Sequence, residues 1–396
     1  MEFRPTLSVR TKICILCLLC LFLPLVGLDP IQRLRSRSIF PLMPKLAILR
    51  LPFSLRSGEL TGPQTLAGLT AAGLPTAGYD LWPDWPVRWL WHSSIPGRRR
   101  IFNAVVARYG LWRLWPAIAE TEWIWICGAS RPLDTGCAFE KKLRRTGKRY
   151  IFQLVDDWFS VPFLRELALA RLPLADLIVV NTPPLVDRVR EFAPQAKILM
   201  LEDPIDVDRL APPDLDAARK PLLAWSGNPN NLKEVPNCAA ALERVYREVP
   251  FEFRIISGHK RPSLALPIPW EWHPYNAERE AELLAGASAG LAPMLDTPYA
   301  RCKGSYKVKT YFAAGLPVVA SPVGHQAMIV EHGRNGFLAE TEDEWVEALL
   351  TLLRDPAKAA AMGKAARHTA ETRFSHAVLM PQWAAGLRQE LGHVAD

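Results

Sequence analysis

Two lysines in the last third of the chain lie four residues apart in a segment with helical spacing. Lys303 and Lys307 are separated by one helical turn, so their side chains leave the same face of a helix. A helix N-terminus adds unpaired N–H groups and positive potential, so the pair can bind a phosphate or diphosphate group. The alternative is a solvated basic helix face, because a third lysine, Lys309, follows.

A second polar cluster follows the apolar run 222–226. Gly227 and Asn228 come directly after Ser226, and Lys233 lies five residues after Asn228. An asparagine side chain donates hydrogen bonds but carries no charge, whereas the lysine is a cation. The cluster therefore fits either a second phosphate contact or a capped loop with an exposed lysine.

Two adjacent carboxylates follow the apolar run 150–155. Asp156 and Asp157 therefore lie at the carboxyl end of a predicted strand, which is where open α/β sheets bind ligands. A carboxylate there can hold a hydroxyl group or stabilise a developing positive charge. A helix N-cap is the alternative for two consecutive aspartates. On the same side, a loop after residue 51 contains Gly58, which can approach phosphates or an acceptor closely because it lacks a side chain.

The elements that must position these residues alternate along the chain. Apolar runs of strand length, separated by segments with helical spacing, predict an α/β fold with buried parallel sheets. The predicted strands are 45–51, 123–127, 150–155, 177–180, 222–226, 251–256, 289–292, 317–320 and 336–339. The predicted helices are 64–73, 163–170, 235–248, 277–285, 306–314, 342–353 and a terminal helix near 376–391.

The alternation predicts two domains behind a leader. Residues 1–43 form the leader, 44–208 a first Rossmann-like domain, 209–375 a second one, and 376–396 a terminal helix. Residues 201–213 are rich in proline and acids, which is typical of a connection between domains. The run Ile13–Leu28 is uncharged but short for a transmembrane helix, so an anchor, an export signal and a dispensable extension all remain open.

Residues 290–353 resemble the nucleotide-sugar-binding half of a group 1 (family 4 type) glycosyltransferase of the GT-B fold. The resemblance rests on several motifs in the family's order: Gly290-Leu-Ala-Pro293, Asp296, Lys303, Lys307, Tyr311 to Val319 (YFAAGLPVV), Ser321 to Gly324 and Gly333 to Leu338. It implies two facing Rossmann-like domains with a C-terminal helix. The first domain would hold the acceptor, and the second would bind the donor through Gly227, Asn228, Lys233, Lys303, Lys307 and Thr310.

The chain departs from the family pattern at three positions. Many members carry two glutamates, where this chain has Cys302 and Thr310, and an arginine where it has Asn228. Neither Cys302 nor Thr310 can act as a carboxylate, although a threonine can still hydrogen-bond a hydroxyl. The departures leave a non-catalytic GT-B-like binding subunit open as an alternative, and a nucleotide-sugar epimerase is a second one.

The resemblance implies transfer of a sugar from a nucleoside-diphosphate sugar to an acceptor hydroxyl, with retention of configuration. It implies no metal ion and no cofactor beyond the nucleotide sugar as co-substrate. The expected acceptor is a glycan or a lipid-linked molecule in surface polysaccharide or glycolipid synthesis. Asp156 and Asp157 are the candidate catalytic residues.

The charge distribution argues against nucleic acid as a partner. The chain carries a net charge of +8, of which +5 lies in residues 1–45, whereas a nucleic-acid binder spreads its positive charge over the folded body. Eight tryptophans lie between Trp82 and Trp125 among arginines, which fits a membrane-interface surface, an aromatic sugar platform or an aromatic core. We expect a cytoplasmic enzyme, with peripheral attachment to the cytoplasmic face of the membrane left open.

Overall fold

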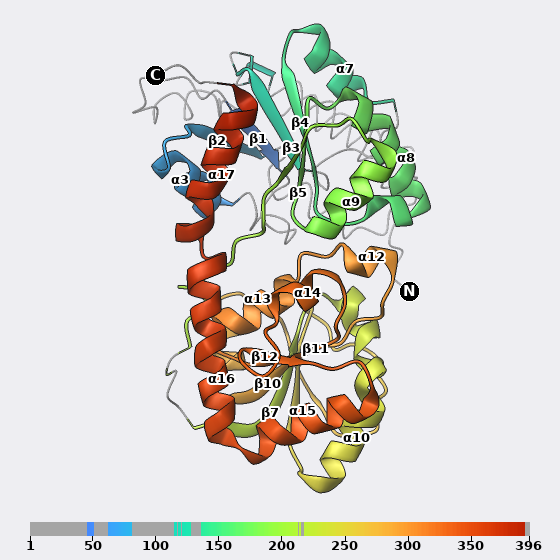
Figure 1. The fold of residues 1–396 in the computed structure, drawn as a ribbon, viewed down its shortest axis with the longest axis vertical. Coiled ribbons are helices and arrows are strands. Elements are labelled where there is room, and N and C mark those ends of the chain that lie inside the picture. The colour runs from blue at the N-terminus through green and yellow to red at the C-terminus, as the bar shows by residue number, and fades with distance from the viewer. Residues whose placement is uncertain are drawn as a thin grey trace, which may run out of the picture. The chain divides into compact units, whose positions relative to one another are not determined.

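Two parallel sheets of six strands each organise the chain (Figure 1). The structure is a computed structural model that describes residues 46–50, 62–80, 115–116, 118–119, 121–127, 136–212, 214 and 218–392. All of these residues lie in one compact unit, residues 44–396. The prediction of an α/β fold with two parallel-sheet domains is confirmed.

The first sheet has the strand order β2-β1-β3-β4-β5-β6. Its strands are β1 (Leu46–Arg50), β2 (Thr76–Asp80), β3 (Trp123–Cys127), β4 (Arg149–Leu154), β5 (Leu177–Val180) and β6 (Ile198–Met200). Its helices are α3 (Pro63–Ala71), α7 (Ala138–Arg145), α8 (Pro162–Arg171) and α9 (Pro183–Phe192).

The second sheet has the order β12-β11-β10-β7-β8-β9. Its strands are β7 (Lys220–Ser226), β8 (Glu252–Ile256), β9 (Glu271–His273), β10 (Ala287–Ala292), β11 (Val318–Ala320) and β12 (Gly336–Leu338). Its helices are α10 (Ala239–Glu248), α11 (Glu280–Leu284), α12 (Pro298–Arg301), α13 (Tyr306–Ala313), α14 (Gly324–Ile329), α15 (Glu342–Arg354) and α16 (Pro356–Thr369).

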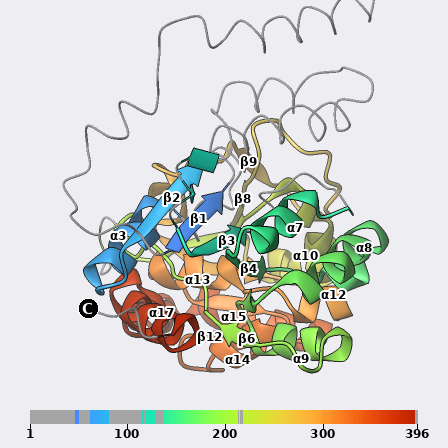
Figure 2. The same ribbon diagram turned by 90° about the horizontal axis from the view of Figure 1, so that it is seen from above.

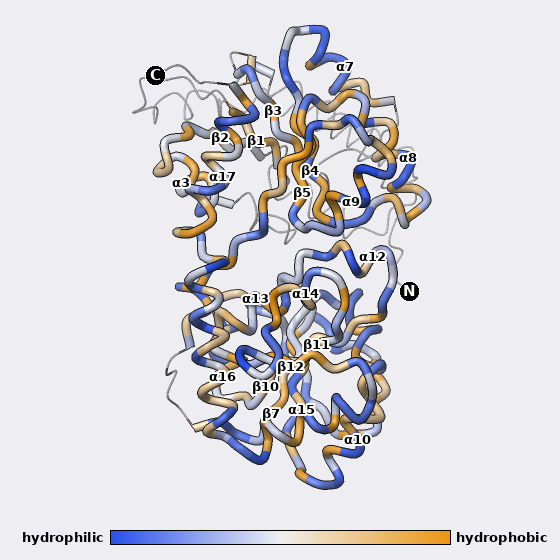
Figure 3. Tube along the Cα trace, viewed as in Figure 1, coloured by the Kyte–Doolittle hydropathy of each residue, from blue (hydrophilic) through white to orange (hydrophobic). Residues whose placement is uncertain are grey.

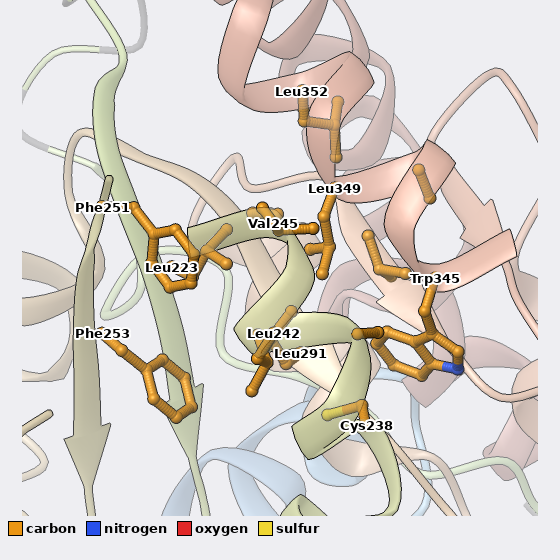
Figure 4. Packing of buried hydrophobic residues seen from close by; sticks show 14 of the residues in the cluster. Leu223, Cys238, Leu242, Val245, Phe251, Phe253, Leu291, Trp345, Leu349 and Leu352 are labelled. Atoms are coloured by element: carbon orange, nitrogen blue, oxygen red, sulfur yellow. The ribbon is translucent and has the colours of Figure 1, made fainter. Parts of the chain in front are cut away.

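The core of the second domain lies on both faces of its sheet, which is why the central strands β7, β10 and β11 are buried along most of their length. Along β7, Leu223 and Trp225 face one cluster, formed with α10 and α15, whereas Leu222 and Ala224 face the other, formed with α13. Figure 4 shows Leu223 of β7 beside Val245 of α10, with Leu349 of α15 nearby. Figure 3 shows hydrophobic residues along strands such as β4 and β5 and also on parts of the helices. A sheet buried on both faces needs apolar residues at successive positions rather than alternate ones.

The last helix, α17 (His376–Leu391), packs on the first sheet rather than on the second. Trp383 lies against Trp125 of β3, with ring centroids 6.1 Å apart, and both side chains are buried. Figure 2 shows α17 beside α3, and Gly68 of α3 allows this close approach because a Cβ there would clash with Met380. The chain therefore returns from the second domain to complete the core of the first.

Two predicted helices are shorter in the structure than their spacing indicates. The segment predicted as a helix over 235–248 begins as a 3₁₀ helix, η7 (Pro229–Cys238), and becomes α-helical only at Ala239. Pro236 lies inside η7 and has no N–H to donate to the preceding turn, so the α-helix starts after it. The helix predicted over 277–285 is α-helical only over Glu280–Leu284.

We expect Trp383→Ala to destabilise the protein by about 3–5 kcal/mol, because it leaves a cavity between α17 and the first sheet. Urea unfolding followed by tryptophan fluorescence and circular dichroism measures the change. Phe163→Ala is the control, since that side chain is 50% exposed and its removal should cost less than about 0.5 kcal/mol. A loss of similar size in both variants would contradict the packing described for α17.

Candidate active site

The two predicted lysine clusters meet at one edge of the second sheet. Lys307, on the first turn of α13, donates a hydrogen bond to the Ser226 carbonyl oxygen at 2.7 Å. Its Nζ also lies 3.5 Å from the centroid of the Trp225 ring, which is a cation–π contact. Gly227 leaves room for this ammonium group, since a Cβ there would lie 2.6 Å from it. Residues about 80 positions apart in the sequence therefore form one polar edge.

Lys303 precedes α13, so the prediction that both lysines lie on one face of a helix is wrong, and Lys303 instead extends this edge toward the loop after β7. Its Nζ donates to the Asn231 side-chain oxygen at 3.3 Å and lies 5.4 Å from the centroid of the Tyr299 ring. Between the two lysines, Ser305 has a positive φ of 53°, and this backbone turn starts α13 directly after the loop. The two ammonium groups thus lie near the N-terminus of α13. This arrangement favours the binding of an anion with two phosphate groups.

Asn228 and Lys233 are arranged as a capped loop with an exposed lysine. The Asn228 side chain accepts a hydrogen bond from the Asn230 N–H at 2.9 Å and caps η7. Lys233 is exposed, and no hydrogen bond or ion pair of its side chain occurs with the described residues. Asn228 follows Gly227 directly, so its backbone lies next to the edge that Lys307 forms.

The two positions that replace the family's acidic pair are both buried. Thr310 is 4% exposed, and its hydroxyl donates to the Tyr306 carbonyl oxygen at 3.0 Å. Cys302 packs into the core of the first domain, and burial raises the pKa of its thiol to about 12. A neutral thiol and an internally bonded hydroxyl cannot replace two carboxylates as charged ligands of a nucleotide sugar.

The two aspartates of the first domain have different surroundings. Asp157 is fully buried and accepts hydrogen bonds from the Phe159 N–H at 2.9 Å and from the Ser160 hydroxyl, so it caps the 3₁₀ helix η5 (Trp158–Ser160). Its Oδ2 also lies 3.4 Å from Arg188 Nε. Asp157 therefore acts as a helix N-cap, which is the alternative interpretation of the two consecutive aspartates.

Asp156 instead faces the second domain. Burial raises the pKa of its carboxyl to about 6, although the positive charge of Lys303 and a hydrogen bond with Tyr299 act in the opposite direction. Tyr299 belongs to α12, which packs against η5. Asp156 therefore lies within electrostatic reach of a lysine of the donor-side edge, and it is the aspartate available for chemistry between the domains.

Lys309 does not lie on a solvated basic face, which is the alternative interpretation of the three lysines. Its side chain is fully buried, and Nζ donates to the Asp203 carbonyl oxygen at 2.9 Å and lies 3.3 Å from Glu202 Oε1. Burial lowers the pKa of Lys309, and it raises that of the Asp203 carboxyl to about 6. The interpretation of the lysines as a solvated basic face is therefore wrong for Lys309.

His325 is also buried and belongs to the same charged cluster. Its Nε2 lies 3.1 Å from Glu202 Oε1, whereas a histidine in a loop is expected to be solvated. Burial by itself would raise the pKa of Glu202, but the hydrogen bond with His325 and the charge of Lys309 outweigh burial and lower it. Sequence reasoning missed this cluster, as it missed Tyr299 and Asn231, because its members come from separate segments that only folding brings together.

Several predicted features lie outside the described residues. They are Gly58, the leader with its apolar run 13–28, and most of the region rich in tryptophan and arginine. The described tryptophans of that region are core residues: Trp123 and Trp125 are buried, and Trp115 packs against the first core. No helix in the described ranges is long and apolar enough to cross a membrane. Within the same ranges, no three His, Cys, Asp or Glu side chains are grouped as metal ligands.

Comparison with known families agrees with this geometry. Residues 220–355 match the family described as "Glycosyl transferases group 1". This segment of the chain is therefore similar in sequence to group 1 glycosyltransferases. The match contains the β7 loop, Lys303 and Lys307, so the polar edge lies inside the family's own domain.

The likeness of the chain to an individual curated protein is distant. The D-inositol 3-phosphate glycosyltransferase of Streptomyces avermitilis is 27% identical over 229 residues, which cover 50% of this chain and 48% of that protein. The match thus spans about half the length of this curated relative.

Two solved structures extend the likeness over both sheets. Sucrose-phosphate synthase from Thermosynechococcus elongatus aligns with a TM-score of 0.66 at 16% identity, over 87% of this chain and 98% of that one. HepE from Anabaena, in complex with UDP-glucose, aligns with a TM-score of 0.61 at 15% identity, over 87% of this chain and 99% of that one. The chain has the GT-B fold.

We expect Asp156→Asn to stabilise the protein at neutral pH. The folded-state pKa of about 6 exceeds the ordinary value near 3.9, so the native state binds this proton more tightly than the unfolded chain does. Stability is therefore lost as the pH rises from about 4 to 6, and the amide removes this loss, on the order of 1–3 kcal/mol at pH 7.

Urea unfolding of both proteins at pH 4, 5, 6 and 7 measures this difference. Asp187→Asn, an exposed aspartate of α9, is the control and should leave the pH dependence unchanged. The prediction would be contradicted by an Asp156→Asn protein that is less stable than wild type at pH 7 and whose stability depends on pH as that of wild type does. Such a result would show that burial does not raise the pKa of this carboxyl.

Proposed function

We propose that the protein transfers a sugar from a nucleoside-diphosphate sugar to an acceptor hydroxyl, with retention of configuration. The observation that carries the proposal is the joining of Lys303 and Lys307 to the β7 loop at one edge of the sheet. A diphosphate develops negative charge as it leaves the sugar, and fixed cations lower the energy of that transition state more than that of the ground state.

The residues of the chain suggest a division of roles in the reaction. Lys303 and Lys307, with the N–H groups at the start of α13, stabilise the departing diphosphate, and Gly227 keeps the backbone beside Lys307 open. An oxygen of the departing diphosphate takes the proton of the incoming hydroxyl. Asp156 faces this edge from the first domain, where its carboxylate holds the acceptor or stabilises positive charge at the anomeric carbon.

We infer that the donor is a hexose linked to a nucleoside diphosphate. The support is by analogy: HepE is described with UDP-glucose, and a pneumococcal O-GlcNAc transferase of similar fold with UDP and GlcNAc. Thr310 and Asn228 are uncharged and stand where the family pattern has charged residues. The two lysines therefore contribute more of the affinity for the diphosphate. A glycan or lipid-linked acceptor in polysaccharide or glycolipid synthesis is the proposed partner.

A non-catalytic binding subunit is the second candidate, because both positions of the acidic pair lack a carboxylate. The two functions make different forecasts for the same purified protein. The enzyme releases nucleoside diphosphate from its donor, whereas the binding subunit binds the nucleotide and releases none.

Lys303→Ala and Lys307→Ala should each lower transfer on the order of a hundredfold, because each removes a cation that faces the leaving group. The assay measures nucleoside diphosphate released from UDP-glucose, UDP-N-acetylglucosamine and GDP-mannose in the presence of a lipid extract. Lys358→Ala, an exposed lysine of α16, is the matched control and should keep the wild-type rate. Near wild-type rates in both lysine variants would show that the diphosphate binds elsewhere, and no release by wild type with any donor would favour the binding subunit.

We also propose that the enzyme works on the cytoplasmic side, attached peripherally to the membrane. The support is the uncharged run 13–28 and the basic residues Arg33, Arg35 and Arg37, each of which adds about 1 kcal/mol of attraction near anionic lipid. Nucleotide sugars are made in the cytosol of bacteria, so an exported enzyme would lack its donor.

Cell fractionation should place the full chain in the membrane pellet. If the basic segment dominates the attachment, about 0.5 M salt should release the protein. At that concentration, salt screens the attraction between charges that are more than a few ångströms apart. Resistance to salt, with release by detergent only, would instead indicate insertion of the apolar run. A mature protein in the periplasm or the medium, cleaved after Leu28, would refute the cytoplasmic placement.

A further inference from the structure

The buried lysine of α13 lies on the side of the helix away from the polar edge. Lys307 reaches the β7 loop, whereas Lys309 points into the protein and has no solvent-exposed surface. A buried ammonium group is costly unless it is paired and hydrogen-bonded. Lys309 therefore needs partners, and all of those found in the structure come from segments that connect the two sheets.

The first connection, residues 201–219, supplies the negative charge. Lys309 Nζ donates to the Asp203 carbonyl oxygen at 2.9 Å and lies 3.3 Å from Glu202 Oε1. Glu202 Oε1 also lies 3.1 Å from His325 Nε2, and the Glu202 carbonyl oxygen accepts a hydrogen bond from Trp383 of α17 at 3.1 Å. One segment of the first connection is thus tied to α13, α14 and α17.

The second connection, which leads from α16 to α17, supplies an aromatic ring. Lys309 Nζ lies 4.7 Å from the centroid of the Phe374 ring. The backbone of Phe374 accepts a hydrogen bond from the Ile205 N–H at 2.8 Å, and Ile205 also forms a bridge with Ser375. The two chain crossings between the domains therefore run side by side, and Lys309 contacts both.

The loop that presents Lys303 rests on the same cluster. Asp203 Oδ2 accepts a hydrogen bond from the Asn181 side chain at 2.6 Å, and both groups lie against Gly304, where a Cβ would come within 2.6 Å of the Asn181 nitrogen. The Cys302 carbonyl oxygen accepts a hydrogen bond from the Thr182 hydroxyl at 3.0 Å. Residues at the end of β5 and in the first connection therefore hold this loop from both sides of Lys303.

We propose that Lys309 is a positioning residue that ties both interdomain connections to the donor helix and so fixes Lys303 opposite Asp156. The inference rests on the proposed function, because it assumes that the reaction needs a lysine of one domain and a carboxylate of the other. Lys309 contacts neither the polar edge nor Asp156, so its effect passes through Asp203 and the Cys302–Ser305 loop. Small misplacements of reacting groups lower the rate strongly, on the order of a hundredfold for about 1 Å.

Hydrogen exchange tests the proposal without reference to catalysis. In Lys309→Met, which keeps a long apolar side chain, amides of Glu202–Asp206 and Cys302–Ser305 should exchange about tenfold faster than in wild type, while those of β10 keep their rates. Lys358→Met is the matched control and should change neither segment. Unchanged exchange in both segments of Lys309→Met would overturn the proposal, whether or not the protein transfers sugar.

Kinetics distinguish positioning from simple loss of stability. The double variant Lys309→Met/Glu202→Gln removes the buried ammonium group together with the charge of the partly exposed carboxylate that pairs with it, and it should regain most of the folding stability that the single variant loses. We expect it to bind UDP within about threefold of wild type, yet to turn over at least about tenfold more slowly. A folded double variant with wild-type turnover, or one that loses UDP binding as strongly as turnover, would overturn the role of Lys309. Absence of transfer by wild type would instead count against the proposed function.

Discussion

Two ammonium groups held at one edge of the second sheet are the constraint on which the rest of the structure depends. Lys303 and Lys307 are oriented by an asparagine oxygen, a backbone carbonyl and an aromatic face, and Asp156 lies within electrostatic reach of Lys303. Hydrogen bonds to neutral oxygens orient an ammonium group while it keeps its positive charge. An anion that enters from solvent can therefore gain from both charges, and the surrounding elements must keep the two side chains together.

The parallel sheets explain why this edge forms at all. Strands β7 and β10 are neighbours in the second sheet, so the loops that follow them leave from the same end, and β7 ends at Ser226 directly before the loop. In the first sheet, β4 ends at Leu154, two residues before Asp156. Both sheets are parallel, so each presents its polar residues at the carboxyl ends of its strands.

The sequence predicts the interior of each sheet well, because strands buried on both faces are continuously apolar. The bounds of β3 and of α17 agree with the prediction. Strands β2, β6 and β9 were not predicted, because each is an edge strand with short or polar sequence, such as Glu271–His273. An edge strand shows no apolar run that would distinguish it from a loop.

The site is predictable only where a motif carries it. The place of Lys307 on the first turn of a helix follows from spacing, and the different direction of Lys309 also follows, since residues two positions apart in a helix point about 200° apart. Lys303 lies before the helix, which its spacing does not predict. Tyr299 and Asn231 could not be predicted, because their proximity to Asp156 and Lys303 arises from folding across domains or loops. The buried cluster around Glu202 is of the same kind, since its members come from four separate segments.

Calorimetric titration with UDP, GDP and ADP, each against its nucleoside, tests the central claim most directly. If the lysine edge binds a diphosphate, at least one nucleoside diphosphate should bind at least about a hundredfold more tightly than its nucleoside, and added salt should weaken that binding. A nucleoside that binds as tightly as its diphosphate, or a diphosphate affinity that salt leaves unchanged, would contradict the account of Lys303 and Lys307.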